Sequence, residues 1–186
     1  MSRPLVVGAV LCGGASSRMG RDKALLLVDG VAMAARVAAA LRAGGCDEVI
    51  AIGGDAAGLT ALGLTVVPDE FPGEGPLGGV ITALTARPEA AMVVAVACDL
   101  PALQPSSTAA LIAALPGHEV AVAGGESGRP QPVCAAWRPH AAAALRPAFL
   151  AGERRMMNAI RLLSQVVVPV PAQDLANVNT PGDLRE

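Results

Sequence analysis

Short apolar runs alternate with mixed segments along most of this chain, a pattern typical of strands alternating with helices. Apolar runs predict strands at 5–10, 48–52, 64–67, 92–98, 120–123, 132–137 and 166–170. Alanine- and leucine-rich segments predict helices at 31–42, 78–86, 106–115 and 156–163, with Gly44-Gly45 ending the first and Ser106 or Ser107 capping the third. The run at 92–98 is apolar throughout, so we expect it at the centre of a parallel sheet.

This order of elements predicts the fold class. Parallel strands joined through helices form a doubly wound α/β sheet, and we expect one mostly parallel sheet in a single domain over residues 1–186. In such sheets ligands bind beyond the carboxyl ends of the strands. The residues that directly follow the strands are therefore the first candidates for a functional site.

Composition narrows the classes of partner. The chain is 53% hydrophobic but only 2% aromatic, so Val, Leu, Ile and Ala must build the core. A net charge of −2 and the shortage of aromatic residues argue against nucleic-acid binding. The longest apolar runs are too short to span a bilayer, and no signal-peptide layout is present, so we expect no membrane contact and a cytoplasmic location.

The segment Leu11–Lys23, LCGGASSRMGRDK, follows the first predicted strand and carries the strongest chemical signal. Glycines allow close approach of the backbone to a ligand, and successive N–H groups in such a turn bind anions. Arg18, Arg21 and Lys23 add positive charge, which favours a phosphate cradle over a merely flexible connection. The spacing matches neither the P-loop nor the dinucleotide-binding fingerprint.

Two aspartates follow later strands. Asp99 ends the run MVVAVACD, where its carboxylate suits Mg²⁺ beside phosphates or, alternatively, caps a turn before Pro101. Asp69 opens the glycine-rich stretch DEFPGEGPLGG, which is either a flexible loop or a rigid wall for base recognition.

Cysteines and histidines give no further site. Cys12, Cys46, Cys98 and Cys134 are scattered without a CxxC pair, which suggests neither a zinc site nor a redox motif. The two histidines, at 118 and 140, stand in turns beside Gly or Pro and are not expected to act in catalysis.

Four segments together carry a family resemblance. LCGGASSRMGRDKALL resembles the nucleotidyltransferase signature LAGGxSxRMGxDKxLL, typical of molybdenum cofactor guanylyltransferases of the MobA-like family. GPLGG, CDLP and ANVNTPGDL resemble further segments of that family, in the same order, so the resemblance covers almost the whole chain. Cys12 departs from the signature, which has alanine there; both residues are small.

The resemblance implies a Rossmann-like nucleotidyltransferase that moves GMP from GTP to the phosphate of the molybdenum–pterin cofactor and releases pyrophosphate. It implies catalytic roles for Arg18, Lys23 and Asp99, with Asp99 as the Mg²⁺ ligand. It implies nucleotide contacts from Leu11, Cys12, Gly13, Lys23, Asp69, Gly78 and Asp99. The second substrate would meet Asn177 and Asn179.

Two alternatives stay open. A cytidylyl- or sugar-phosphate nucleotidyltransferase would use the same loop, since residue types do not settle the base. A non-catalytic nucleotide-binding partner protein would bind GTP without turnover. Arg154 and Arg155 are candidates for a second phosphate, and contacts with cofactor-delivery or acceptor proteins are left open.

Overall fold

A computed structural model describes residues 3–13, 22–125 and 128–178, and its centre is a seven-stranded sheet. The strand order is β5-β4-β1-β6-β8-β7-β9. The strands are β1 (Val6–Leu11), β4 (Glu48–Ile52), β5 (Thr65–Val67), β6 (Met92–Ala97), β7 (Val120–Gly124), β8 (Pro130–Trp137) and β9 (Gln165–Pro169).

The sheet is mostly parallel, which confirms the predicted fold class. The pairs β1–β4, β1–β6, β4–β5 and β7–β9 are parallel, whereas β8 runs antiparallel to both β6 and β7. The apolar strand β6 takes the middle position, as its sequence predicts.

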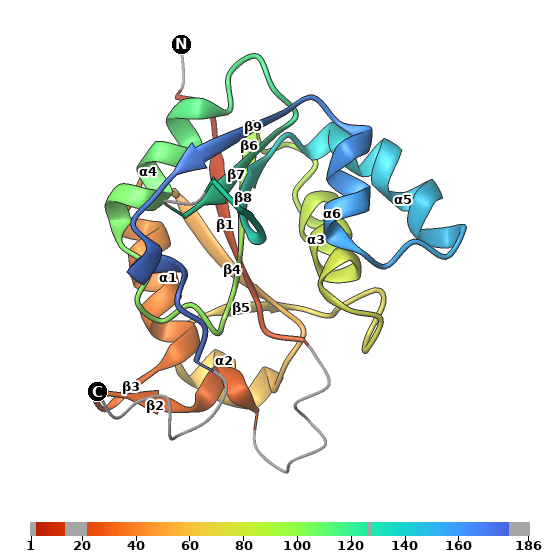
Figure 1. Ribbon diagram of the computed structural model, residues 1–186. Helices are drawn as coiled ribbons and strands as arrows, with labels where there is room; N and C mark the ends of the chain where they lie inside the picture. Colours follow the sequence, from red (N-terminus) through yellow and green to blue (C-terminus); the bar gives the residue numbers. More distant parts are fainter. Residues whose placement is uncertain (1–2, 14–21, 126–127, 179–186) are drawn as a thin grey trace.

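Helices cover both faces of the sheet, as Figure 1 shows. One face carries α1 (Met33–Ala43), α2 (Ala56–Ala61) and α4 (Pro105–Ala114); the other carries α3 (Pro76–Ala86), α5 (Ala142–Leu150) and α6 (Met156–Ala159). Along β1, Val6 and Val10 face the first layer, while Val7 and Ala9 face the second. This alternation builds two cores, one on each side of the sheet.

Several element boundaries differ from the predictions. The predicted helix 31–42 begins only at Met33, because Val31–Ala32 forms β3 and pairs with β2 (Leu27–Val28). Gln104, not a serine, stands at the N-cap of α4, and the Ser107 hydroxyl instead donates to the buried carboxylate of Asp174. The predicted helix 156–163 divides into α6 and a 3₁₀ turn, Ile160–Leu162.

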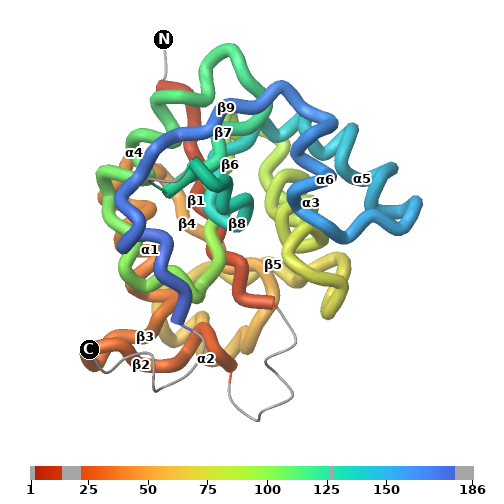
Figure 2. Tube along the Cα trace, in the orientation of Figure 1, coloured from red at the N-terminus to blue at the C-terminus, as the bar shows by residue number. Residues whose placement is uncertain are grey.

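The segment after β9, blue in Figure 2, turns back toward the carboxyl edge of the sheet. It passes through a 3₁₀ turn at Ala172–Leu175, and Val178 then donates its N–H to the carbonyl of Asp99 at 2.9 Å. This bond joins the C-terminal segment to the end of β6. Within the described residues, no helix combines the length and apolar character needed to cross a bilayer.

Candidate nucleotide-binding and transfer site

The candidate residues gather where the parallel strands end. Cys12 and Gly13 follow β1, Gly53 and Gly54 follow β4, Asp69 follows β5, and Cys98 and Asp99 follow β6. The order of β5, β4, β1 and β6 in the sheet brings these ends together. The sequence prediction of a site at this edge is therefore supported by the arrangement of the strands.

Lys23 and Asp99 form an ion pair at the edge. The Lys23 Nζ lies 2.9 Å from Asp99 Oδ2, and the two side chains are 16% and 23% exposed. A partly buried pair of this kind interacts more strongly than one on the open surface. The pair places one fixed cation and one fixed carboxylate beside each other, between the ends of β1 and β6.

Asp22 fixes the position of Lys23, a role the sequence reasoning missed. Its Oδ1 accepts a hydrogen bond from Ala24 N at 2.9 Å and so caps the 3₁₀ turn Lys23–Leu25. Its Oδ2 accepts the N–H of Asp55, which begins α2. The turn that carries Lys23 is thereby tied to the end of β4.

The first two amides of the glycine turn are already engaged. Cys12 N and Gly13 N both donate to the carbonyl of Ile52, at 2.9 and 3.1 Å, while the Leu11 carbonyl accepts from Cys98 N. These bonds lock the start of the turn to β4 and β6. The contribution of Leu11, Cys12 and Gly13 to nucleotide binding stays a prediction.

Gly13 allows a carboxylate to lie against the backbone. A Cβ added at Gly13 would lie 3.2 Å from Asp69 Oδ2, and one added at Gly53 would lie 3.3 Å from Gly13 Cα. Gly53 also has a φ of +66°, which side-chain-bearing residues seldom adopt. Glycine is therefore needed at both positions to hold Asp69 beside the end of β1.

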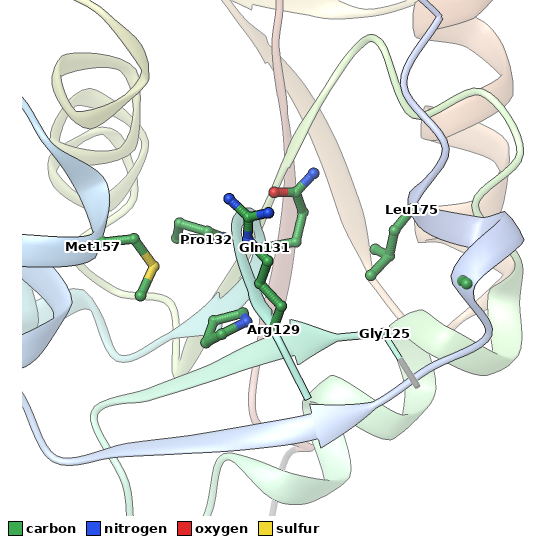
Figure 3. A pocket seen from close by; sticks show the side chains of 8 residues that line it. Gly125, Arg129, Gln131, Pro132, Met157 and Leu175 are labelled. Carbon is green, nitrogen blue, oxygen red and sulfur yellow. The ribbon is translucent and has the colours of Figure 1, made fainter. Parts of the chain in front are cut away.

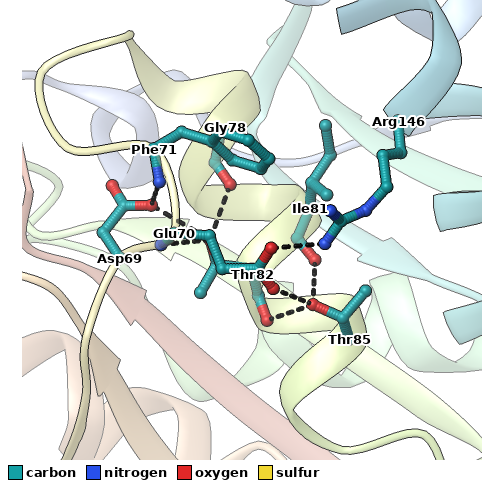
Figure 4. Close-up of polar contacts among 8 residues, drawn as sticks. All are labelled: Asp69, Glu70, Phe71, Gly78, Ile81, Thr82, Thr85 and Arg146. Atoms are coloured by element: carbon teal, nitrogen blue, oxygen red, sulfur yellow. Dashed lines mark hydrogen bonds and ion pairs between the residues drawn. The ribbon is translucent and has the colours of Figure 1, made fainter. Parts of the chain in front are cut away.

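Thr82 holds the other oxygen of Asp69, as Figure 4 shows. Asp69 Oδ1 accepts from Thr82 Oγ1 and from Phe71 N, both at 3.0 Å. Thr82 is only 2% exposed and also accepts the N–H of Glu70. Thr82 belongs to none of the motifs in the sequence, and its only sequence signal is a hydroxyl inside the apolar helix segment GGVITALT.

Two arginines brace the loop that follows Asp69. Arg146 on α5 pairs with Glu70 and lies 5.5 Å from the centre of the Phe71 ring, while the Phe71 and Phe149 rings are 4.6 Å apart. Burial raises the pKa of Glu70, but hydrogen bonds from Arg146 and Thr85 outweigh it and lower that pKa overall.

Arg154 forms the second brace. Its Nε lies 2.8 Å from Glu74 Oε2, its Nη1 donates to the Phe149 carbonyl, and its guanidinium lies 3.8 Å from the centre of the Phe149 ring. These contacts account for Arg154 as a support of the 69–75 loop. The second-phosphate role considered for Arg154 and Arg155 stays a prediction.

Gly78 has a packing reason to be glycine. It lies in the first turns of α3, where an added Cβ would come within 2.8 Å of Phe71 Cβ, and its carbonyl accepts from Thr82 Oγ1. Gly78 is buried beneath the loop. Its predicted contact with nucleotide stays a prediction, and the geometry assigns it the support of Phe71.

The structure brings Cys12 and Cys98 together, which their spacing in the sequence conceals. Interaction with Cys98, followed by burial, holds the pKa of the Cys12 thiol well above its ordinary value. All four cysteines are buried, and none forms a disulfide. Their scatter along the sequence, without a CxxC pair, gives no indication that two of them are neighbours.

A pocket of about 490 Å³ opens at the ends of β7 and β9. Figure 3 shows Met157 on one side and Leu175 on the other, with Arg129 and Gln131 between them. Its volume is in the range of small-molecule sites, roughly 300–1,000 Å³. Arg129 offers a guanidinium suited to phosphate, and sequence reasoning missed it because it stands in a Gly-rich turn outside every motif.

Two predicted site residues, Arg18 and Asn179, lie outside the described residues. Asn177 is described, and it directly precedes Val178, whose N–H binds the Asp99 carbonyl. The second-substrate segment therefore begins beside the Lys23–Asp99 pair.

Asp99 is the candidate ligand for a metal ion at this edge. Among residues 3–13, 22–125 and 128–178, no group of three or more His, Cys, Asp or Glu side chains is placed to hold a metal ion. Mg²⁺ is commonly held by one or two carboxylates together with substrate phosphates and water. Asp99 therefore fits an ion that binds with a triphosphate, rather than one held by the protein alone.

A doubly wound sheet with a glycine turn after its first strand and an ion pair at its carboxyl edge defines a nucleotide-binding α/β protein. The family model of the MobA-like NTP transferase domain matches residues 8–167. The chain belongs to this family.

A curated relative agrees with this assignment, and solved structures share the fold. The probable molybdenum cofactor guanylyltransferase of Chloroflexus aggregans is 35% identical, over 97% of this chain and 92% of that protein. Molybdopterin-guanine dinucleotide biosynthesis protein A from Archaeoglobus fulgidus has a similar fold, with a TM-score of 0.76, 23% identity and coverage of 96% and 95% of the two chains. The 4-diphosphocytidyl-2C-methyl-D-erythritol synthase of Anaerococcus prevotii shares the fold, with a TM-score of 0.78, 14% identity and coverage of 97% and 93%.

Proposed function

We propose that this protein transfers GMP from GTP to the terminal phosphate of the molybdenum–pterin cofactor and releases pyrophosphate. The Lys23–Asp99 pair at the carboxyl edge of the sheet carries the proposal, in a chain whose relatives are named for this activity. A cation and a carboxylate side by side suit a bound triphosphate, because phosphoryl chemistry depends on charge neutralisation and positioning.

Each half of the edge receives one substrate. The nucleotide binds over Gly13 and Asp69, with its triphosphate directed toward Lys23, and Arg18 of the preceding segment adds a second cation. The acceptor enters the pocket at Arg129 and Gln131. Asn177 stands in the chain between Leu175, which lines this pocket, and Val178, which binds the Asp99 carbonyl. An acceptor phosphate oxygen then attacks the α-phosphorus in line, forming the new P–O bond as the bond to pyrophosphate breaks.

Magnesium is part of the proposal. Asp99 would hold the ion together with phosphate oxygens, and when bound it would supply further neutralisation of the triphosphate. Lys23 orients Asp99 through their 2.9 Å contact and binds phosphate once the triphosphate arrives. Removal of divalent ions with a chelator is expected to abolish pyrophosphate release, and added Mg²⁺ to restore it.

The test is a transfer assay with purified protein, Mg²⁺, the phosphorylated molybdenum–pterin acceptor, and GTP, CTP or UTP in parallel. Pyrophosphate release and the mass of the dinucleotide product are measured. We expect GTP to be preferred, and Lys23→Ala and Asp99→Ala each to lower the rate by roughly 10²-fold. The matched controls are Arg3→Ala and Asp47→Ala, which break an exposed ion pair of 2.8 Å near the amino ends of β1 and β4.

Other outcomes would contradict the proposal. Near wild-type rates in both site variants would remove Lys23 and Asp99 from the chemistry. Preference for CTP or UTP would favour the cytidylyl- or sugar-phosphate alternative. Binding of GTP without any product, when the acceptor is supplied, would favour a non-catalytic binding protein.

A further inference from the structure

Cys12 and Cys98 directly follow the ends of two neighbouring parallel strands. Leu11 of β1 is paired with Ala97 of β6, and each cysteine is the next residue along the chain. Cys98 N donates to the Leu11 carbonyl at 3.1 Å, which completes the Leu11–Ala97 pairing and holds the first residue after β6 against the end of β1. The two cysteines therefore stand next to the last paired residues of the two strands.

Their side chains point to the same side of the sheet. Side chains two residues apart in a strand point to the same face, so Cys12 continues the face of Val10 and Cys98 continues the face of Val96. All four residues belong to one buried cluster. Neighbouring strands lie about 4.7–4.9 Å apart, within the roughly 4.4–6.8 Å between Cα atoms that a disulfide spans. Each cysteine is 7% exposed, so a small oxidant has limited access to the pair.

The pair stands inside the candidate site. Gly13, with Asp69 against it, follows Cys12, and Asp99, with Lys23 against it, follows Cys98. A covalent bond between the two sulfurs would fix the distance between Gly13 and Asp99. It would also move these two residues away from the positions in which they bind substrate. Sub-ångström shifts of this kind matter most where several groups must meet one ligand.

We propose that Cys12 and Cys98 are a site of reversible disulfide formation, with a low-molecular-weight disulfide such as oxidised glutathione as the oxidant, and that closing this bond blocks nucleotide binding. One cysteine loses its proton and attacks a sulfur of the glutathione disulfide as the thiolate, which forms a mixed disulfide and releases one glutathione thiolate. The second cysteine loses its proton in turn and attacks the protein-bound sulfur, which forms the Cys12–Cys98 bond and releases the second glutathione thiolate. The two protein thiols are oxidised, the glutathione disulfide is reduced, and the two thiol protons end on the two glutathiones.

Cys134 is the competing partner for Cys98. It lies on β8 opposite Val96, two residues before Cys98, in the same buried cluster. A diagonal neighbour of this kind is farther away than a directly opposite one, roughly 7–8 Å against about 5 Å. The shorter separation therefore favours Cys12 as the partner of Cys98. Cys46 stands before β4, at the other end of the parallel strands, and is remote from Cys12 and Cys98.

The full-length protein is treated with oxidised glutathione, with and without GTP and Mg²⁺, and then alkylated and mapped by non-reducing peptide mass spectrometry. We expect a peptide pair joined through Cys12 and Cys98, lighter by two hydrogens than the sum of its parts, that is lost on addition of dithiothreitol. Nucleotide is expected to slow its formation. GTP affinity, measured by calorimetry, is expected to fall about tenfold or more on oxidation and to return on reduction.

Variants separate the pair from the other cysteines. Cys12→Ala places the residue of the family signature at this position, and Cys98→Ala removes the partner; each treated sample is compared with its own untreated sample. Both variants are expected to lose the sensitivity of GTP affinity to oxidant, whereas Cys46→Ala and Cys134→Ala keep it.

Three results would overturn the inference. These are the absence of a Cys12–Cys98 link after treatment, a link from Cys98 to Cys134 in its place, or the expected link with unchanged GTP affinity. If the reduced protein fails to bind GTP, the proposed function fails, while the peptide map still decides whether the disulfide forms.

Discussion

The two halves of the carboxyl edge are built in opposite ways. The half proposed to bind the nucleotide, at the ends of β1, β4 and β5, is closely packed: a Cβ added at Gly13 or Gly53 would lie only 3.2 or 3.3 Å from its nearest neighbour. The acceptor half, at the ends of β7 and β9, is an open pocket of about 490 Å³. There, a Cβ added at Gly125 would meet none of the described atoms within 4 Å.

This difference separates two ways of recognising a ligand. The packed half fixes the position of one carboxylate through backbone contacts, so its selectivity depends on shape. The open half presents Arg129 and Gln131 on side chains, so its selectivity depends on charge and hydrogen bonding. Small changes of volume should damage the first half, and only loss of a polar group should damage the second.

The largest expected effect is that of adding one methyl group to the nucleotide half. Gly13→Ala forces Asp69 to move, because the new Cβ would lie 3.2 Å from Asp69 Oδ2. We expect kcat/KM for GTP to fall by roughly 20- to 50-fold, because Asp69 must shift by a few tenths of an ångström and a full misplacement of about 1 Å costs about a hundredfold. Gly125→Ala is the matched control in the open half and should change kcat/KM by less than about twofold. Equal effects of the two substitutions would contradict the comparison.

Loss of the Arg129 charge should affect only the acceptor half. Arg129→Ala removes the guanidinium from the pocket, and we expect KM for the acceptor to rise about tenfold, since a hydrogen bond to a charged group contributes roughly 1.5–3 kcal/mol. The KM for GTP should not change. Arg161→Ala, an exposed arginine of the 3₁₀ turn after α6, serves as control. An equal rise in both KM values would show that the two halves are not separate.

A smaller effect is expected from Thr82, which holds Asp69 through a hydrogen bond. Thr82→Val keeps the shape of the side chain but removes the 3.0 Å hydrogen bond from Thr82 Oγ1 to Asp69 Oδ1, which keeps only the one from Phe71 N. We expect the free energy of unfolding in urea to fall by about 1–2 kcal/mol and KM for GTP to rise severalfold. Thr108→Val is the matched control, because the buried Thr108 Oγ1 has no hydrogen-bond partner among the described residues. That control should be neutral or stabilising.

The smallest effect concerns pH. The pKa of Glu70 is lowered in the folded protein, so its pair with Arg146 stabilises the loop above the ordinary glutamate pKa. This contribution is lost as the pH falls through the lowered pKa. An exposed pair of this kind contributes less than about 1 kcal/mol. Urea unfolding should show a shallower acid dependence below pH ~4.3 in Arg146→Ala than in wild type; identical pH profiles would contradict this role for the pair.

Much of the fold follows from the chain's own pattern. The strand Glu48–Ile52 has the predicted bounds, and the apolar run at 92–98 takes the central place in the sheet. The elements that escaped prediction have atypical sequences. Helix α2 contains Gly58, which lets it pack closely on Leu25, and α5 contains Pro147 in its interior.

The site was predictable where it depends on residue type and unpredictable where it depends on strand order. Lys23, Asp69 and Asp99 carry charges at the ends of predicted strands, so their grouping follows from the topology of a doubly wound sheet. The antiparallel direction of β8, the Cys12–Cys98 pairing and the hydrogen bond from Thr82 to Asp69 each need the register of distant segments. Local patterns hold no information about that register.

Lys23 is the only lysine in the sequence. A protease specific for lysine therefore has one cleavage point in the whole chain, and that bond lies in the 3₁₀ turn capped by Asp22. Cleavage requires the turn to open, so the rate of appearance of two fragments reports the local opening free energy beside the Lys23–Asp99 pair. Without any label or engineered reporter, the native chain provides a direct measure of how firmly each ligand closes its own site.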